Sequence, residues 1–190
     1  MTLRTLSVKS VPTGKGIPTF DLSAVTYGDF TDRNIKITSA DKKRVQNLWV
    51  KNGDIFIERS NTPELVGTAR LYPGEDNRAI FPDLLIRVRV NQEAAPRWVE
   101  ICLQSHRLRR YFKSRAQGIS GTMPKIDQQT IMDAEIPLPP ISDQRRLISS
   151  VDRYLSIIKE TEDEVDSNLK RANLLRQSIL LKAFTGKLTN

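Results

Sequence analysis

The stretch Ile136-Pro137-Leu138-Pro139-Pro140-Ile141 divides the sequence into two parts of different character. Proline cannot continue a helix or donate to a sheet ladder, so the stretch predicts a rigid, extended connector. Neither proline nor glycine follows it until Gly186. We therefore expect two parts: a folded domain over residues 1–140 and a long helix over residues 141–190.

The second part is predicted to be a single helix of about 40 residues, roughly 60 Å long. Ser142 is the expected N-cap, and Asp143 is favourably placed in the first turn because the helix dipole attracts negative charge there. A helix of this length cannot be covered along its whole length by a domain of 140 residues. Its apolar positions should therefore show what packs against it.

Two interleaved series of positions recur every seven residues along this helix. They are Val151, Ile158, Val165, Ala172 and Ile179, and Ile148, Leu155, Glu162, Leu169, Arg176 and Ala183. A heptad repeat sustained over about five repeats predicts a coiled coil. The opposite charges of Glu162 and Arg176 favour an antiparallel pair centred near Leu169. The alternative is a long amphipathic helix folded onto its own domain.

The first part has the pattern of a small α+β domain. Short runs rich in Ile, Val, Phe and Thr, separated by turn residues, predict strands at 17–25, 35–38, 54–59, 65–71 and 84–90. This spacing favours a small, bent, mixed β-sheet with short helices, followed by one long C-terminal coiled-coil helix. Within 84–90, the alternation predicts Ile86 and Val88 facing the core, with Arg87 and Arg89 facing solvent.

One longer helix is expected inside this domain, beginning at Pro96, a residue favoured at the first helical position. Trp98, Ile101, Ser105, Leu108 and Phe112 recur at spacings of three and four, which predicts one inward stripe. The basic residues of the segment lie broadly on the opposite side, where Val99 and Leu103 also fall. That overlap indicates that the first turns are covered on both sides and that only the last turns are free.

Positive charge is concentrated in the same region. The whole chain carries 30 Lys+Arg against 22 Asp+Glu, and residues 97–125 hold seven basic residues and one acid. Such a concentration is typical of a surface that follows nucleic-acid phosphates. The alternative is a solubilising helix face.

Catalytic groups are scarce in the sequence. The chain has one cysteine, Cys102, and one histidine, His106, and we expect the cysteine to be buried and the histidine exposed rather than a catalytic pair. We expect no enzymatic activity of its own, no cofactor and no metal. The opening residues lack the apolar run of a signal peptide, and no stretch has the length of a membrane span, so a cytoplasmic protein without membrane contact is expected.

Five segments resemble the DNA specificity subunit of Type I restriction-modification systems. They are Gly53–Thr62, Leu65–Thr68, Gly118–Ile126, Ile136–Gln144 and Lys182–Leu188, and the resemblance extends from about Gly16 to Leu188. Asp143 departs from it, because the family usually has glutamate there.

The resemblance implies a target recognition domain that reads a short half-site in double-stranded DNA, followed by a helical spacer. A full specificity subunit has two such units, whereas this sequence has one of each, which implies a half-subunit that forms a homodimer and reads a symmetric bipartite site. The implied partners are methyltransferase (modification) subunits and an endonuclease/translocase subunit. The other hypothesis is a coiled-coil interaction protein, or an antagonist, that binds such subunits without itself specifying DNA.

In the DNA-recognition reading, two groups of residues are the candidates for DNA contact. Phosphate contacts are expected from Arg107, Arg110, Lys113, Arg115 and Lys125. Base reading is expected from Arg59, Asn61, Thr62, Ser120 and Thr122, since Arg and Asn can make paired hydrogen bonds to guanine and adenine. The alternative for Asn61-Thr62-Pro63 is an ordinary turn.

Overall fold

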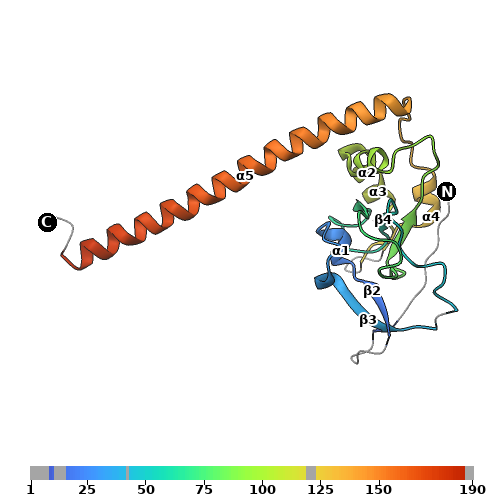
Figure 1. Ribbon diagram of the computed structural model, residues 1–190, viewed down its shortest axis with the longest axis horizontal. Helices are drawn as coiled ribbons and strands as arrows, with labels where there is room; N and C mark the ends of the chain where they lie inside the picture. The colour runs from blue at the N-terminus through green and yellow to red at the C-terminus, as the bar shows by residue number, and fades with distance from the viewer. Residues whose placement is uncertain (1–8, 11–15, 42, 119–122, 187–190) are drawn as a thin grey trace. The chain divides into compact units, whose positions relative to one another are not determined.

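The computed structural model describes residues 9–10, 16–41, 43–118 and 123–186 (Figure 1). The chain divides into two compact units, Met1–Arg145 and Arg146–Asn190. Among the described residues, the first unit contains the strands, the short helices and the start of the long helix, and the second contains the rest of that helix. The α+β class predicted from the sequence is confirmed.

The described strands form two three-stranded sheets, and each pair of neighbouring strands is antiparallel. The first sheet has the order β1-β3-β2, with β1 (Lys9–Ser10), β2 (Ile17–Phe20) and β3 (Ile35–Ser39). The second has the order β5-β4-β6, with β4 (Ile55–Glu58), β5 (Ala69–Leu71) and β6 (Leu85–Val88). The strands are thus divided between two sheets rather than gathered in one.

The second sheet is buried on both faces. On one face Phe56 and Leu85 join the first hydrophobic cluster, and on the other Ile55, Ile57 and Ile86 join the second cluster beneath the helices. Every residue of β4 and β6 is consequently buried. This sheet forms the middle layer of the domain.

The burial of both faces makes the prediction for Arg87 wrong. The residue is only 2% exposed, and its side chain donates hydrogen bonds to the carbonyl oxygens of Trp49 (3.1 Å) and Asn47 (2.9 Å). The guanidinium also lies 5.0 Å from the centre of the Phe81 ring and 3.8 Å from a carboxylate oxygen of the buried Asp54. Alternation in a sequence marks the two faces of a strand, but it does not show whether the polar face meets water or a second layer.

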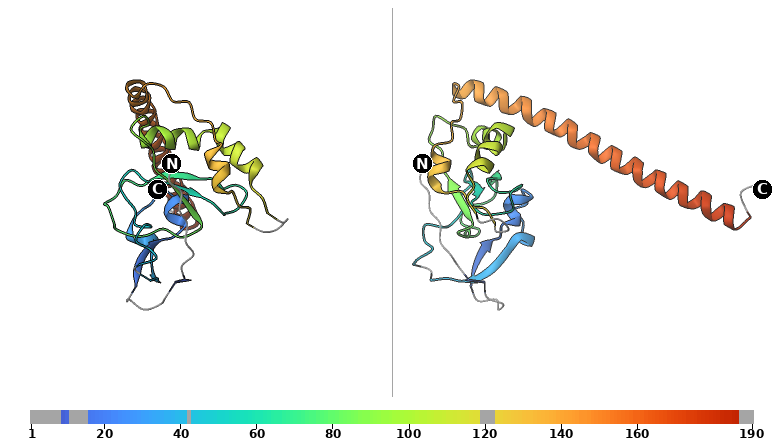
Figure 2. Two further views of the ribbon diagram at one scale, coloured as in Figure 1. Left: turned by 90° about the vertical axis from the view of Figure 1, so that its right-hand side faces the viewer. Right: turned by 180° about the vertical axis from the view of Figure 1, so that it is seen from behind.

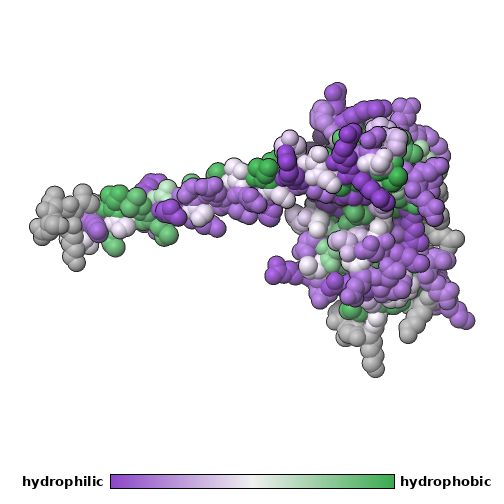
Figure 3. Space-filling view, turned by 45° about the horizontal axis from the view of Figure 1, so that its top comes forward, coloured by the Kyte–Doolittle hydropathy of each residue, from purple (hydrophilic) through white to green (hydrophobic). Residues whose placement is uncertain are grey.

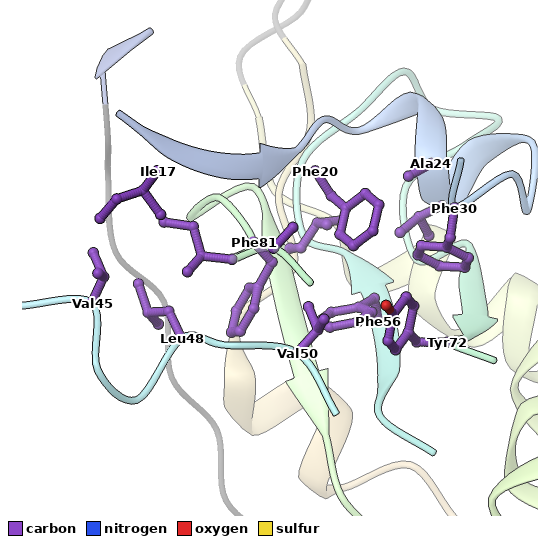
Figure 4. Packing of buried hydrophobic residues seen from close by; sticks show 14 residues of the cluster. Ile17, Phe20, Ala24, Phe30, Val45, Leu48, Val50, Phe56, Tyr72 and Phe81 are labelled. Atoms are coloured by element: carbon purple, nitrogen blue, oxygen red, sulfur yellow. The ribbon is translucent and has the colours of Figure 1, made fainter. Parts of the chain in front are cut away.

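Aromatic rings fill the first cluster (Figure 4). The ring centres of Phe20 and Phe30 are 5.4 Å apart with an edge-to-face geometry, and those of Phe56 and Phe81 are 5.0 Å apart. These rings connect the first sheet to the middle sheet. Edge-to-face and tilted contacts of this kind add to the stability gained from burial alone.

The helix expected from Pro96 is two helices, α2 (Pro96–Gln104) and α3 (His106–Arg115). Ser105 lies between them with a ψ of 148°, and its hydroxyl accepts a hydrogen bond from the backbone N–H of Leu108. Ser105 is therefore the N-cap of α3 and not part of a buried stripe. In α2 the buried side chains include Val99, Cys102 and Leu103.

Three short helical elements were not predicted. They are α1 (Ser23–Thr26), the 3-10 helix η1 (Asp32–Asn34) and α4 (Gln128–Met132). Because α1 occupies positions predicted as strand, the expected strand 17–25 ends at Phe20. The expected strand 65–71 likewise begins only at Ala69, since residues 63–67 form a turn.

The long helix α5 runs from Ile141 to Phe184, a length of 44 residues (Figure 2). It begins one residue before the predicted N-cap, so Ser142 lies inside its first turn. From Arg153 onward every residue of α5 is exposed. No helix in the described ranges is long and apolar enough to cross a membrane.

Gln144 fastens the first turn of α5 to the rest of the first unit. Its side chain is completely buried, and its amide nitrogen donates to the carbonyl oxygens of Glu93 (2.9 Å) and Pro139 (2.8 Å). Its amide oxygen accepts from the backbone N–H of Ala95 at 2.9 Å. One side chain thus satisfies three backbone groups from two segments.

Replacing Gln144 with alanine should lower the free energy of unfolding by about 2 kcal/mol or more, because buried backbone groups would lose their partners. Urea unfolding followed by circular dichroism measures this change. Gln177→Ala, an exposed glutamine of the same helix, is the matched control and should change stability by less than about 0.5 kcal/mol. Equal effects of the two substitutions would contradict the role of Gln144.

Candidate nucleic-acid interface

The outer side of α3 is strongly basic. Arg107, Arg110, Lys113 and Arg115 are exposed, whereas Leu108 and Phe112 are buried in the second cluster. We call the four exposed residues the α3 basic surface. The buried leucine and phenylalanine fix the rotation of the helix, so the charged side chains point outward.

A hollow of about 710 Å³ lies beside this surface. The α3 side of its lining includes Arg107, Arg110 and Arg115, and Asp133 and Glu135 contribute acidic groups. Arg107 forms an exposed ion pair of 3.2 Å with Glu135, and the guanidinium of Arg115 lies 4.2 Å from the centre of the Tyr111 ring. A polyanion would accordingly be attracted to the α3 side of the hollow and repelled by the acidic groups.

Backbone pairing brings Arg59 and Ser60 next to Lys125. The N–H of Ile126 donates to the carbonyl oxygen of Arg59 at 2.9 Å, and Ser60 pairs with Lys125 in an antiparallel bridge. Lys125 also exchanges two backbone hydrogen bonds with Gln117, of 2.9 and 2.8 Å. Segments far apart in the sequence therefore meet at one place. The predicted site residues Ser120 and Thr122 fall between Gln117 and Lys125 in the sequence but lie outside the described residues.

Asn61 occupies a different environment from the one predicted. Its side chain is 7% exposed, its amide nitrogen donates to Oε2 of Glu58 at 2.7 Å, and its amide oxygen accepts from the backbone N–H of Thr62 at 2.8 Å. Both ends of the amide are engaged within the protein, which argues against direct base reading. Thr62, the next residue, is exposed.

Arg109 is the basic residue of α3 that faces inward. Its guanidinium donates to the carbonyl oxygens of Glu64 (2.6 Å) and Val66 (3.0 Å). Burial lowers the pKa of Arg109, and the neighbouring charge of Glu58 opposes that shift. Arg109 therefore holds the turn Asn61–Gly67 against α3. In the sequence, Arg109 counts among the seven basic residues of 97–125. Its charge alone does not show that its side chain faces inward.

Glu58 is the second functional candidate that sequence reasoning missed. It ends β4 with a completely buried side chain, and its carboxylate accepts hydrogen bonds from the hydroxyl of Thr26 and the amide of Asn61. Burial raises the pKa of Glu58, whereas these hydrogen bonds and the charges of Arg109 and Arg70 act in the opposite direction. An acidic residue after three apolar residues is common at the end of a strand. The local sequence therefore does not indicate that the carboxylate of Glu58 is buried.

The cysteine and the histidine do not form a catalytic pair. Cys102 is buried, and desolvation raises the pKa of its thiol, which disfavours the reactive thiolate. His106 is exposed at the start of α3. The expectation of a buried cysteine and an exposed histidine is confirmed.

Relatives with curated names support the resemblance found in the sequence, although no family model matches the chain. The chain is 30% identical over 186 residues to the Type I restriction enzyme EcoKI specificity subunit of Escherichia coli (strain K12), covering 97% of this chain and 40% of that protein. It is 26% identical over 184 residues to the StySPI specificity subunit of Salmonella potsdam, covering 92% and 39%. The chain thus spans about 40% of the length of these relatives.

Solved structures show the same fold. A chain from a structural study of the assembly and conformational transition of the type I R-M system has a TM-score of 0.66 and 22% identity, with 98% of this chain and 44% of that chain covered. The HsdS subunit from Thermoanaerobacter tengcongensis has a TM-score of 0.58 and 24% identity, with 98% and 43% covered.

Gly67 is a position where the backbone of the turn lies directly against a side chain of α3. It has a φ of +77°, and a Cβ built there would lie 2.7 Å from the Cβ of Phe112. Gly67→Ala should therefore lower the free energy of unfolding by about 2 kcal/mol more than Gly53→Ala. Gly53 has a φ of +83° but would meet its nearest atom at 3.7 Å, so it isolates the cost of backbone conformation. Urea unfolding of the two variants gives the difference, and equal losses would show that the contact with Phe112 is unimportant.

Proposed function

We propose that this chain, a relative of the specificity subunits of Type I restriction enzymes, is the non-catalytic subunit that recognises DNA for such an enzyme in the cytoplasm. The observation that carries the proposal is the α3 basic surface in the same unit as the paired segments Arg59–Ser60 and Lys125. In protein–DNA complexes, contacts to phosphates set the position of the protein, and side chains on nearby loops read base edges. The first unit offers both kinds of group.

Within this proposal the phosphates are contacted by the α3 basic surface and Lys125. Arg59, Thr62, Ser120 and Thr122 are the candidates for base reading. Arg59 is partly exposed and Thr62 is exposed, so both are accessible. Asn61 is assigned instead to the support of its turn, because its amide is already hydrogen-bonded within the protein.

We further propose that two copies pair through α5 as an antiparallel coiled coil. The heptad positions carry apolar side chains that are largely exposed in the single chain, among them Leu155 (48%), Ile158 (53%), Val165 (59%) and Leu169 (59%). Apolar side chains also gather on the last turns of α5, visible as green patches in Figure 3. Burying a seam of this length would remove a large apolar surface from water. A span of about 40% of each relative is consistent with a half-subunit that regains its second half by dimerising.

The dimensions of α5 suit a bipartite site. At about 1.5 Å per residue, 44 residues extend about 66 Å. An antiparallel pair of this length can separate two recognition domains by several tens of Å, enough for half-sites about one DNA turn, or 34 Å, apart. Two identical domains related by a two-fold axis would read a symmetric sequence.

Some apolar residues of α5 lie outside the seam and support a second partner. Leu174 and Leu181 are seven residues apart and are each 67% exposed, but they belong to neither heptad series. A two-stranded coiled coil would leave them in water. We assign them to the recruitment of a methyltransferase (modification) subunit, which would in turn allow an endonuclease/translocase subunit to join.

The test of the function is to sequence the methylome of cells that carry the chain together with its modification subunit. The proposal predicts methylation within a symmetric bipartite motif. Methylation without an enriched motif would overturn DNA specificity and favour the interaction protein or antagonist instead.

The α3 basic surface should determine the salt dependence of DNA binding. Arg110→Ala and Lys113→Ala should each make the slope of log K against log salt shallower by about 0.9, because one phosphate contact is lost. Titrations of a random-sequence duplex over a salt series measure the slope. Lys43→Ala removes an exposed lysine from the turn after β3 and should leave the slope unchanged. If all three variants lose the same slope, the positive charge acts diffusely and α3 is not the contact.

The seam of α5 should control the mass of the particle in solution. Leu155→Asp and Leu169→Asp should give monomers in sedimentation, since a charge would have to be buried between the helices. Leu174→Asp, on the same helix but outside the seam, should leave the dimer intact. An unchanged mass for the first two variants would contradict pairing through these positions.

A further inference from the structure

The buried carboxylate of Glu58 joins two segments that are distant in the sequence. One oxygen accepts from the hydroxyl of Thr26, the last residue of α1, and the other accepts from the amide of Asn61 at 2.7 Å. Because the Glu58 side chain is completely buried, the hydrogen bond to Asn61 is shielded from water and the one to Thr26 is partly shielded. The carboxylate therefore acts as a fixed point between α1 and the turn Asn61–Gly67.

The turn held in this way carries a candidate base-reading residue. Asn61 accepts a hydrogen bond from the N–H of Thr62, and Arg109 binds the carbonyl oxygens of Glu64 and Val66 on the far side of the tip. The backbone of the turn is therefore restrained at both ends by buried or half-buried side chains. Only the tip, residues 62–64, is left exposed, and there the Thr62 side chain is hydrogen-bonded to the Glu64 carboxylate.

An acid at this position is costly for stability alone. A buried carboxylate must be compensated by partners, and well-packed apolar residues often replace buried ionic groups without loss of stability. The partners of Glu58 are Thr26, Asn61 and the nearby charges of Arg109 and Arg70. Of these, Asn61 belongs to the turn and Arg109 binds its carbonyl oxygens, which indicates that the network helps to define the shape of this tip.

We propose that Glu58 is a positioning residue for base recognition, holding the turn Asn61–Gly67 in the conformation in which Thr62 meets the DNA. The proposal rests on the DNA-recognition function given above. Glu58 itself does not contact DNA, because its side chain has no exposed surface. Its loss should therefore affect discrimination between sequences and leave the phosphate contacts intact.

The experiment uses the full chain in complex with its modification subunit and two duplexes, one with the methylated motif and one with the same bases shuffled. Glu58→Gln and Asn61→Ala should each reduce the ratio of the two affinities about tenfold, the loss expected when a good base contact is misplaced. Affinity for the shuffled duplex and its salt slope should stay within about twofold of the wild type. The double variant should lose no more discrimination than the stronger single variant, because the two residues act through one hydrogen bond.

Glu100→Gln is the matched control. Glu100 is also a buried glutamate, 4% exposed, and it bonds to Leu71, Arg97 and Gln104 rather than to the turn. It should reduce thermal stability but keep the wild-type discrimination. Asn61→Ala, at the outer end of the network, tests the proposal even if Glu58→Gln does not fold.

Two results would overturn the inference, and they are distinguishable. If the wild type prefers its motif and Glu58→Gln and Asn61→Ala prefer it equally, the positioning role is wrong and the proposed function stands. If the wild type binds both duplexes equally, the proposed function fails and the positioning role fails with it.

Discussion

The burial of the middle sheet on both faces is the constraint on which the first unit depends. Aromatic rings cover one face, and α2 and α3 cover the other. A strand with two buried faces must place any polar side chain against a specific partner, because water is not available to it. Arg87 meets backbone carbonyl oxygens, and Glu58 meets Thr26 and Asn61. The polar groups of this sheet thus connect the core to the loops around it.

Helix α3 links that core to the charged exterior. Phe112 packs under Gly67 and Arg109 binds the turn beyond it, while the α3 basic surface faces solvent. The same ten residues therefore support one exposed turn and present charge beside it. In the proposed function, such an arrangement would keep the phosphate-binding groups and the base-reading turn at a fixed spacing.

The features that could be predicted from the sequence are those encoded in local patterns. Pro96 marks the start of α2, and the run without proline or glycine after Pro140 gives α5 to within a few residues. What could not be predicted depends on contacts between distant segments. Ser105 fits the spacing of a buried stripe, and only the structure shows that the helix is interrupted there. Arg87 and Asn61 were predicted to be exposed, but other segments of the fold cover them. The exposed basic residues of α3 could be predicted because charged side chains strongly prefer water. Arg109 could not be distinguished from them in the sequence, because the three carbonyl groups that bind it come from residues 64–66, more than 40 positions away.

The exposure of α5 has a consequence for the abundance of the protein. More than thirty consecutive helical residues in the described chain are exposed from Arg153 onward, and a helix of that kind gains most of its stability from packing. Without a partner helix it opens readily and is accessible to proteases; with one, the same residues are protected by mass action. The survival time of a newly made chain would then depend on how soon it forms the helix pair proposed for α5. For the pair of identical chains proposed above, protection would increase with the concentration of the chain itself.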